Sequence, residues 1–104
     1  MVNVNILLDK VLPIINKTIE LGYHNDLKKE WLAEDLERIL NVDKYNPLSG
    51  IAIFNNSSIR IELSKTFYLS MDIEIPSVNK KYIENLSIIL DMIEIFNQEI
   101  KEIK

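Results

Sequence analysis

The sequence contains no cysteine, and this absence excludes several kinds of site at once. Without thiols the chain can form no disulfide, zinc finger, iron–sulfur ligand set or thiolate nucleophile. A single histidine, His24, also excludes a transition-metal site built from several imidazoles. The lack of cysteine suits a reducing compartment. We therefore expect a cytoplasmic protein that binds neither a metal nor another cofactor.

Glycine is nearly as scarce, with Gly22 and Gly50 alone in the chain. Phosphate-binding loops, dinucleotide-binding fingerprints and nucleophile elbows need glycines in patterns that these two do not make. A catalytic triad would have to include His24, and the sequence identifies neither its hydroxyl nor its carboxylate partner. A histidine in a loop or at a helix start is the simpler interpretation. We expect that the protein is not an enzyme.

Positive charge and long apolar runs are also in short supply. Twelve Lys and Arg against sixteen Asp and Glu leave a net charge of -4, so no global positive field attracts nucleic acid. No segment reaches the ~18 to 20 apolar residues that cross a bilayer. The apolar first segment carries Asp9 and Lys10 in its middle and lacks a basic leader. We expect no direct nucleic acid binding, no membrane span and no signal peptide.

The composition that remains is that of one folded domain. The 104 residues are 47% apolar and 27% charged. A chain of this size buries about 60 to 70% of its unfolded surface, which is enough for one core. We expect a single domain over residues 1–104. The many Ile, Asn and Lys residues beside only two Arg are typical of an AT-rich genome, such as that of a low-GC bacterium, its phage or a mobile element.

Two amphipathic helices are predicted in the first part of the chain. Apolar residues recur at helical spacing over 4–21, where Pro13 predicts a kink or a break near 9–13 and Gly22 predicts a left-handed C-cap. A second helix is predicted over 27–41. Its first amides would be capped by Asn25 or Asp26, and its core side consists of Leu32, Ala33, Leu36, Ile39 and Leu40.

The middle of the chain switches to the two-residue period of strands. The β-branched and aromatic runs 51–54, 59–63 and 67–75 predict a three-stranded antiparallel meander. A three-residue second turn would place Leu63 opposite Phe67, Ile61 opposite Leu69 and Ile59 opposite Met71. Both faces of the first strand are apolar. If the first turn pairs Phe54 with Ile59, the alternate side chains, Ile51 and Ile53, point outward.

A long final helix is predicted between Pro76 and Lys104, with Ser77 or Asn79 as its cap. Its main apolar stripe consists of Tyr82, Ile83, Leu86, Ile89, Leu90, Ile93, Phe96, Ile100 and Ile103. Ile88, Met92 and Ile95 extend the stripe, either because the helix is held between other elements or because they form a homodimer or partner interface. The order α-α-β-β-β-α predicts an α+β fold of two layers, with the helices on one face of the sheet.

Candidate binding residues lie at positions predicted to be exposed. On the outward face of the sheet these are Arg60, Glu62, Tyr68, Asp72 and Glu74. Tyrosine and arginine are enriched at interface hot spots, whereas an ordinary solvated face is the simpler interpretation. The spacing of the carboxylates matches no calcium loop, so a magnesium or calcium site is not favoured.

The second helix adds two candidates on its polar side, Trp31 and Arg38. We interpret Trp31 either as an exposed anchor for a partner or as a cover for the loop over 42–50, together with Tyr45. As an anchor, Trp31 would be flanked by Leu27 and Arg38, and on this interpretation Trp31 and Arg38 are predicted binding residues.

These features predict a small acidic protein that acts by binding another protein. A stoichiometric inhibitor fits best, such as an immunity protein or a phage or mobile-element protein that blocks a defence factor by occupying a basic cleft. One alternative is a homo-oligomeric accessory or structural subunit assembled through the last helix. Another is a protein that binds or sequesters a nucleotide or metabolite in a pocket near Tyr23, His24 and Tyr45.

Overall fold

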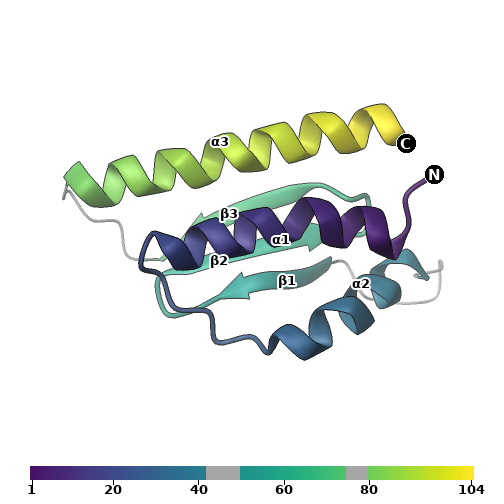
Figure 1. Cartoon of the computed structure of the whole chain (residues 1–104), viewed down its shortest axis with the longest axis horizontal. Coiled ribbons are helices and arrows are strands. Elements are labelled where there is room, and N and C mark those ends of the chain that lie inside the picture. The colour runs from purple at the N-terminus through teal and green to yellow at the C-terminus, as the bar shows by residue number, and fades with distance from the viewer. Residues whose placement is uncertain (42–49, 75–79) are drawn as a thin grey trace.

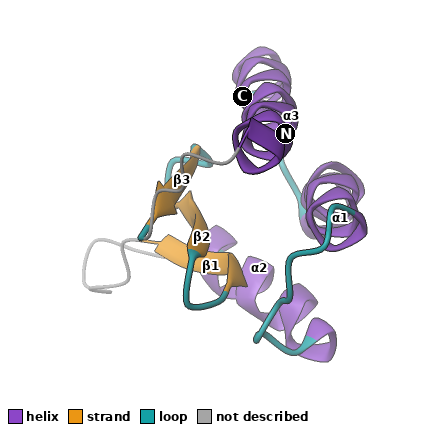
Figure 2. Cartoon of the chain, turned by 90° about the vertical axis from the view of Figure 1, so that its left-hand side faces the viewer, coloured by secondary structure: helices purple, strands orange, loops and turns teal. Residues whose placement is uncertain are grey.

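Three helices pack against a three-stranded antiparallel sheet in the predicted order α-α-β-β-β-α (Figure 1). The computed structural model describes residues 1–41, 50–74 and 80–104. The elements are α1 (Val4–Glu20), the 3₁₀ turn η1 (Lys29–Trp31), α2 (Leu32–Leu40), β1 (Gly50–Asn55), β2 (Ile59–Ser64), β3 (Leu69–Ile73) and α3 (Lys80–Ile103). In Figure 2 the helices lie to one side of the sheet, which confirms the α+β class.

Helix α1 begins and ends at the caps that its sequence provides. The Asn3 side chain accepts a hydrogen bond from the Ile6 amide at 2.9 Å. At the other end Gly22 has a φ of 105°, and its amide donates to the carbonyl of Ile19. The Tyr23 amide donates to Thr18, which completes a Schellman motif and confirms the predicted C-cap. The helix runs through Pro13 without interruption, so of the two predicted outcomes, a kink or a break, the break is wrong.

Helix α2 is shorter than the pattern predicts. The segment predicted as its first turn includes η1, and α-helix begins only at Leu32. Asn25 does accept from the Leu27 amide at 3.1 Å, but it also accepts from the amide of Asn55, so it ties the connection to β1 instead of capping α2. Leu36 is buried as predicted, whereas Ala33 is exposed. Leu32 and Ile39 are also buried and Leu40 is partly buried, so the predicted stripe faces the core except at Ala33.

The register between β2 and β3 differs from the prediction by two residues. Leu63 pairs with Leu69, not with Phe67. The reason is that Phe67 belongs to the turn, where it adopts a φ of 64° and donates its amide to Ser64 at 2.9 Å. With Phe67 in this left-handed conformation, the three-residue hairpin loop consists of residues 65–67. The expected loop, 64–66, lies one position earlier. Because the shift is an even number, the apolar face of the sheet stays inside.

A β-bulge settles which side of β1 is buried. The pairing moves from Ala52 opposite Glu62 to Phe54 opposite Ile61, so Ile53 is the extra residue. A bulge places two consecutive side chains on nearly the same face, and both Ile53 and Phe54 are buried. Phe54 does not pair with Ile59, so the condition under which Ile51 and Ile53 would point outward is not met, and both are buried.

Helix α3 runs along the sheet and supplies much of the core. Its buried apolar residues are Leu86, Ile89, Ile93, Phe96 and Ile100. Two members of the predicted stripe, Ile83 and Leu90, are instead exposed, although the helix contacts both α1 and β3. The predicted roles of Tyr45, Pro76, Ser77 and Asn79 fall outside the described residues.

Candidate functional site

No described helix covers the outer face of the sheet (Figure 2). The side chains of β2 and β3 alternate, so the even-numbered residues point away from the helices. Of the residues predicted for partner binding, Arg60, Glu62 and Asp72 lie in the paired strands on this face. Tyr68 directly precedes β3 and Glu74 directly follows it, at the two ends of the same row. Alternation alone was enough to find them, because the observed register keeps the predicted parity.

Charge on this outer face is unbalanced. The Arg60 guanidinium donates to the Glu62 carboxylate at 3.2 Å, and Arg60 also lies opposite Asp72 in the ladder. Glu74 lies near Arg60 and Asp72, so three carboxylates accompany one arginine, which is paired with Glu62. Tyr68 stands at the start of the row with 60% of its surface exposed. The outer face is therefore acidic, with a large aromatic ring at one end.

Trp31 and Arg38 do not join the outer face. They belong to η1 and α2, which lie on the helix side of the sheet. Trp31 is exposed, and the Lys28 ammonium lies 4.9 Å from the ring centre, in cation–π contact. Arg38 is held by Asp35 at 3.0 Å. The predicted binding residues therefore divide between two separate surfaces.

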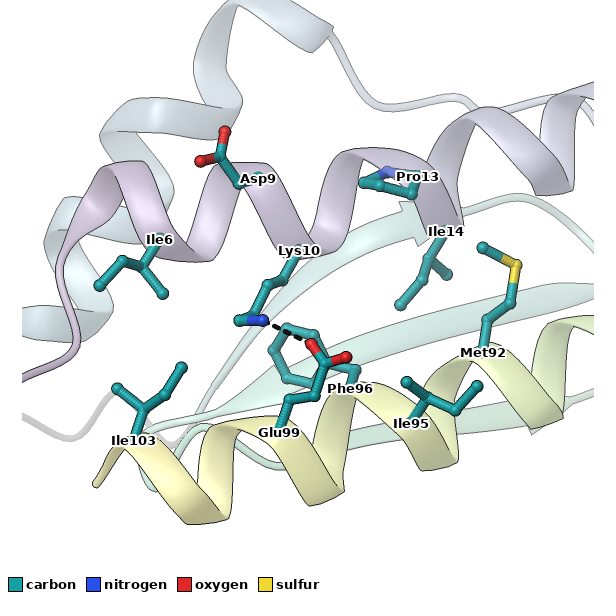
Figure 3. Close-up of a pocket in the computed structure, with 10 residues that line it drawn as sticks. All are labelled: Ile6, Asp9, Lys10, Pro13, Ile14, Met92, Ile95, Phe96, Glu99 and Ile103. Carbon is teal, nitrogen blue, oxygen red and sulfur yellow. Dashed lines mark hydrogen bonds and ion pairs between the residues drawn. The ribbon is translucent and has the colours of Figure 1, made fainter.

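The three residues that widen α3 do not share one environment. Ile88 and Ile95 are 39% and 58% exposed, so the interpretation that the fold buries them is wrong for these two. Met92 packs against the core. Met92 and Ile95 also line a groove of ≈ 450 Å³ between α1 and α3 (Figure 3). An ion pair between Lys10 and Glu99 bridges this groove.

A pocket lies where the sequence placed one, beside Tyr23 and His24. It has a volume of ≈ 260 Å³ between α1, the chain that leads into α2, and β1. The His24 ring is exposed and contacts the Asp26 carboxylate at 2.9 Å. His24 lies in the connection between α1 and η1, so it is a loop residue as the simpler interpretation expected.

Among the described residues, Tyr23 is the one whose pKa departs clearly from its ordinary value. Its ring meets Tyr82 edge to face at 6.0 Å, and its buried hydroxyl makes no hydrogen bond of standard geometry to a described residue. Burial raises the pKa of the Tyr23 phenol, the nearby Asn85 side chain offsets part of the rise, and Tyr82 adds to it. The neutral phenol is thus the form that the fold favours.

Replacing Tyr23 with phenylalanine is expected to leave the protein at least as stable at neutral pH, with a gain of up to about 1 kcal/mol, because an unsatisfied buried hydroxyl is removed. The pKa of Tyr23 is higher in the folded state than in the unfolded state. The neutral phenol therefore contributes its full share to the free energy of unfolding below the usual tyrosine pKa of about 10, and this share is lost as the pH rises through the pKa of the folded state. Urea unfolding from pH ~8 to ~11 should show a steeper alkaline loss for wild type. Equal alkaline slopes would contradict the assignment.

Sequence analysis missed two features of this structure. Asn97 bonds to both main-chain groups of Leu69, and nothing in a polar residue on a helix signals such a contact. The exposed pair Ile83 and Leu90 was placed in the core stripe, and only the position of β3 shows that it is open.

Three further observations bear on function. Over residues 1–41, 50–74 and 80–104, no group of three or more His, Asp or Glu side chains could hold a metal ion. In the same described part, none of the helices has the length and apolar character to cross a membrane. Comparison with protein-family models, curated proteins and solved structures gives no match.

Proposed function

We propose that this protein binds another protein and acts as a stoichiometric inhibitor, with the outer sheet face docked on a basic surface or cleft of its target. The observation that carries the proposal is the uncovered face on which Glu62, Asp72 and Glu74 accompany a single arginine, Arg60. Tyr68 supplies a rigid aromatic side chain of the kind enriched at interface hot spots.

The proposed inhibition depends on electrostatic complementarity between the two proteins and needs no catalytic group. An acidic face is attracted to a cationic cleft over distances of about a Debye length, which raises the association rate and makes it sensitive to salt. Enzymes that handle nucleic acid expose such clefts, and an immunity or anti-defence protein would act by filling one. A cytoplasmic site of action is part of this proposal, since the chain has no cysteine that needs an oxidising compartment.

The test is a charge reversal with a matched control. The face variant carries Glu62→Lys, Asp72→Lys and Glu74→Lys, and the control carries Glu84→Lys, Asp91→Lys and Glu102→Lys, all exposed positions on α3. Both variants have the same net charge. Tagged proteins are used to capture the target from native lysate at low and moderate salt, with identification by mass spectrometry.

One stoichiometric basic protein should be retained by wild type and by the control. The face variant is expected to lose about 100-fold in affinity or more, since each desolvated charge pair at an interface contributes roughly 1.5 kcal/mol or more. Equal loss in both variants would show that only net charge matters and would overturn the assigned face. Recovery of the protein alone at twice its monomer mass would favour the homo-oligomer, and a melting temperature raised by nucleotides would favour the small-ligand alternative.

A further inference from the structure

Strand β3 is an edge strand whose outer side has unpaired positions. The sheet order is β1-β2-β3, so β3 has one neighbour among the described strands. Ser64 donates to the carbonyl of Tyr68, and Glu74 donates to the carbonyl of Ser58. Even-numbered residues of β3 therefore bond toward β2. Because main-chain groups alternate along an antiparallel strand, the amides and carbonyls of the odd-numbered residues Leu69, Met71 and Ile73 point to the outer edge.

The first of these outer positions is already filled by a side chain that imitates a strand. The Leu69 amide donates to Asn97 Oδ1 at 2.7 Å, and Asn97 Nδ2 donates to the Leu69 carbonyl at 3.0 Å. This is the pair of bonds that a neighbouring strand residue would make. Among the described residues, Met71 and Ile73 have no such partner at the edge. No described residue therefore fills these two consecutive pairing positions.

An apolar wall stands beside these open positions. Helix α3 runs antiparallel to β3 (Figure 1), and the Asn97 bonds identify the side of the helix that faces the strand edge. Leu90 and Ile83 precede Asn97 by two and four helical turns, so they lie on the same side of α3, toward the end of β3. They are 43% and 51% exposed. At the start of β3 the same side opens into a groove of ≈ 720 Å³ between Tyr68 and Asn97.

The charged residues around the β3 edge indicate which kind of chain segment could pair with it. Asp72 and Glu74 project from β3 on the outer face, and the exposed Glu94 lies on the strand-facing side of α3. A second copy of β3 would place its own Asp72 and Glu74 on the same outer face, and like charges across strands are destabilising. A basic segment would instead neutralise the group.

We infer that the β3 edge binds an extended segment of a partner protein as a fourth strand, one that alternates apolar and basic side chains. Its main chain pairs with Met71 and Ile73, its apolar side chains contact Leu90 and Ile83, and its basic side chains lie beside Asp72 and Glu74. This goes beyond the proposed function, because the ligand is a short unfolded segment and not the cleft of a folded target. The site stands on its own if no protein docks on the outer face.

The experiment measures fluorescence anisotropy of labelled peptides with the full chain at physiological salt. The probe is a seven-residue peptide of alternating valine and lysine. Its two controls are the same peptide with N-methyl groups on its amides and a peptide of alternating valine and glutamate. We expect saturable binding of the first peptide, affinity at least about tenfold weaker for the N-methylated form, and none for the glutamate form. Equal binding of the N-methylated peptide would overturn strand pairing.

Variants of the helices distinguish binding at the β3 edge from non-specific hydrophobic binding of the peptide. Leu90→Asn with Ile83→Asn removes the apolar wall, and Ile88→Asn with Ile19→Asn changes two exposed isoleucines away from the β3 edge. The first pair should weaken the peptide by about tenfold, and the second should leave it unchanged. Circular dichroism confirms that both variants are folded. Equal weakening by both pairs, or a peptide-independent dimer in sedimentation, would reject the assigned site. These outcomes leave the charge-reversal test of the outer face unaffected, since no target protein is present.

Discussion

Replacing Phe54 with alanine is expected to lower the free energy of unfolding by about 3 to 5 kcal/mol. The ring is fully buried and lies opposite Ile61 at the point where the bulge turns two consecutive side chains inward. Truncation removes apolar burial and leaves a cavity between the sheet and the helices. Since domains of this size are stable by only about 5 to 15 kcal/mol, the variant would lose a large part of its stability.

Urea unfolding followed by circular dichroism measures this loss. Phe54→Leu is the graded control, because leucine keeps part of the volume and should cost distinctly less. A parallel variant, Ala52→Val, adds volume on the outer side of the same strand and should change stability little. A loss below about 1 kcal/mol for the alanine variant would contradict the bulge, since it would mean that Phe54 does not fill the core.

The change of Asn97 to aspartate is expected to cost about 1 to 3 kcal/mol at neutral pH. The bond from the Leu69 amide survives, because a carboxylate oxygen can accept it. The bond to the Leu69 carbonyl is lost, because a carboxylate has no proton to donate and two oxygens then face each other. Gln98→Glu makes the same chemical change at an exposed neighbour and should be nearly neutral.

The cost of this Asn97 variant should depend on pH in a definite direction. A protonated carboxyl can donate to the Leu69 carbonyl, so the folded state favours the neutral form and the pKa of the introduced group lies above its unfolded value of about 3.9. The bond is therefore complete below that value and is lost as the pH rises through the folded pKa. Urea unfolding between pH ~4 and ~7 should show that the difference in free energy of unfolding between wild type and the variant becomes smaller as the pH falls. A difference that is constant with pH would show that Asn97 does not donate to Leu69.

The order and type of the elements could be read from the sequence because they depend on local properties. Helical spacing marked α1 and α3, two-residue alternation marked β2, and Gly22 supplied the backbone conformation that ends α1. The exact pairing of β2 with β3 could not be read in this way. It depends on Phe67 adopting a left-handed conformation that its own residue type disfavours and that the surrounding turn imposes.

Of the candidate surfaces, one could be predicted from local sequence properties and the other could not. The members of the outer face were predictable because alternation places every second residue of a strand on one side, whatever the register shift, as long as the shift is even. The exposed flank of α3 was not predictable. A helical projection shows that Leu90 and Ile83 neighbour the core stripe, but it contains no information on how far β3 reaches around the helix.

The sequence by itself determined the α+β class, the six main elements, the acidic balance and the row of polar residues on the outer face, because each follows from residue type and short-range spacing. Only the tertiary structure decided that the bulge at Ile53 buries both it and Phe54, that Asn97 fills one position of the β3 edge, and that Leu90 lies open beside the next positions. Those outcomes depend on contacts between residues distant in the chain, where packing and main-chain pairing are settled together.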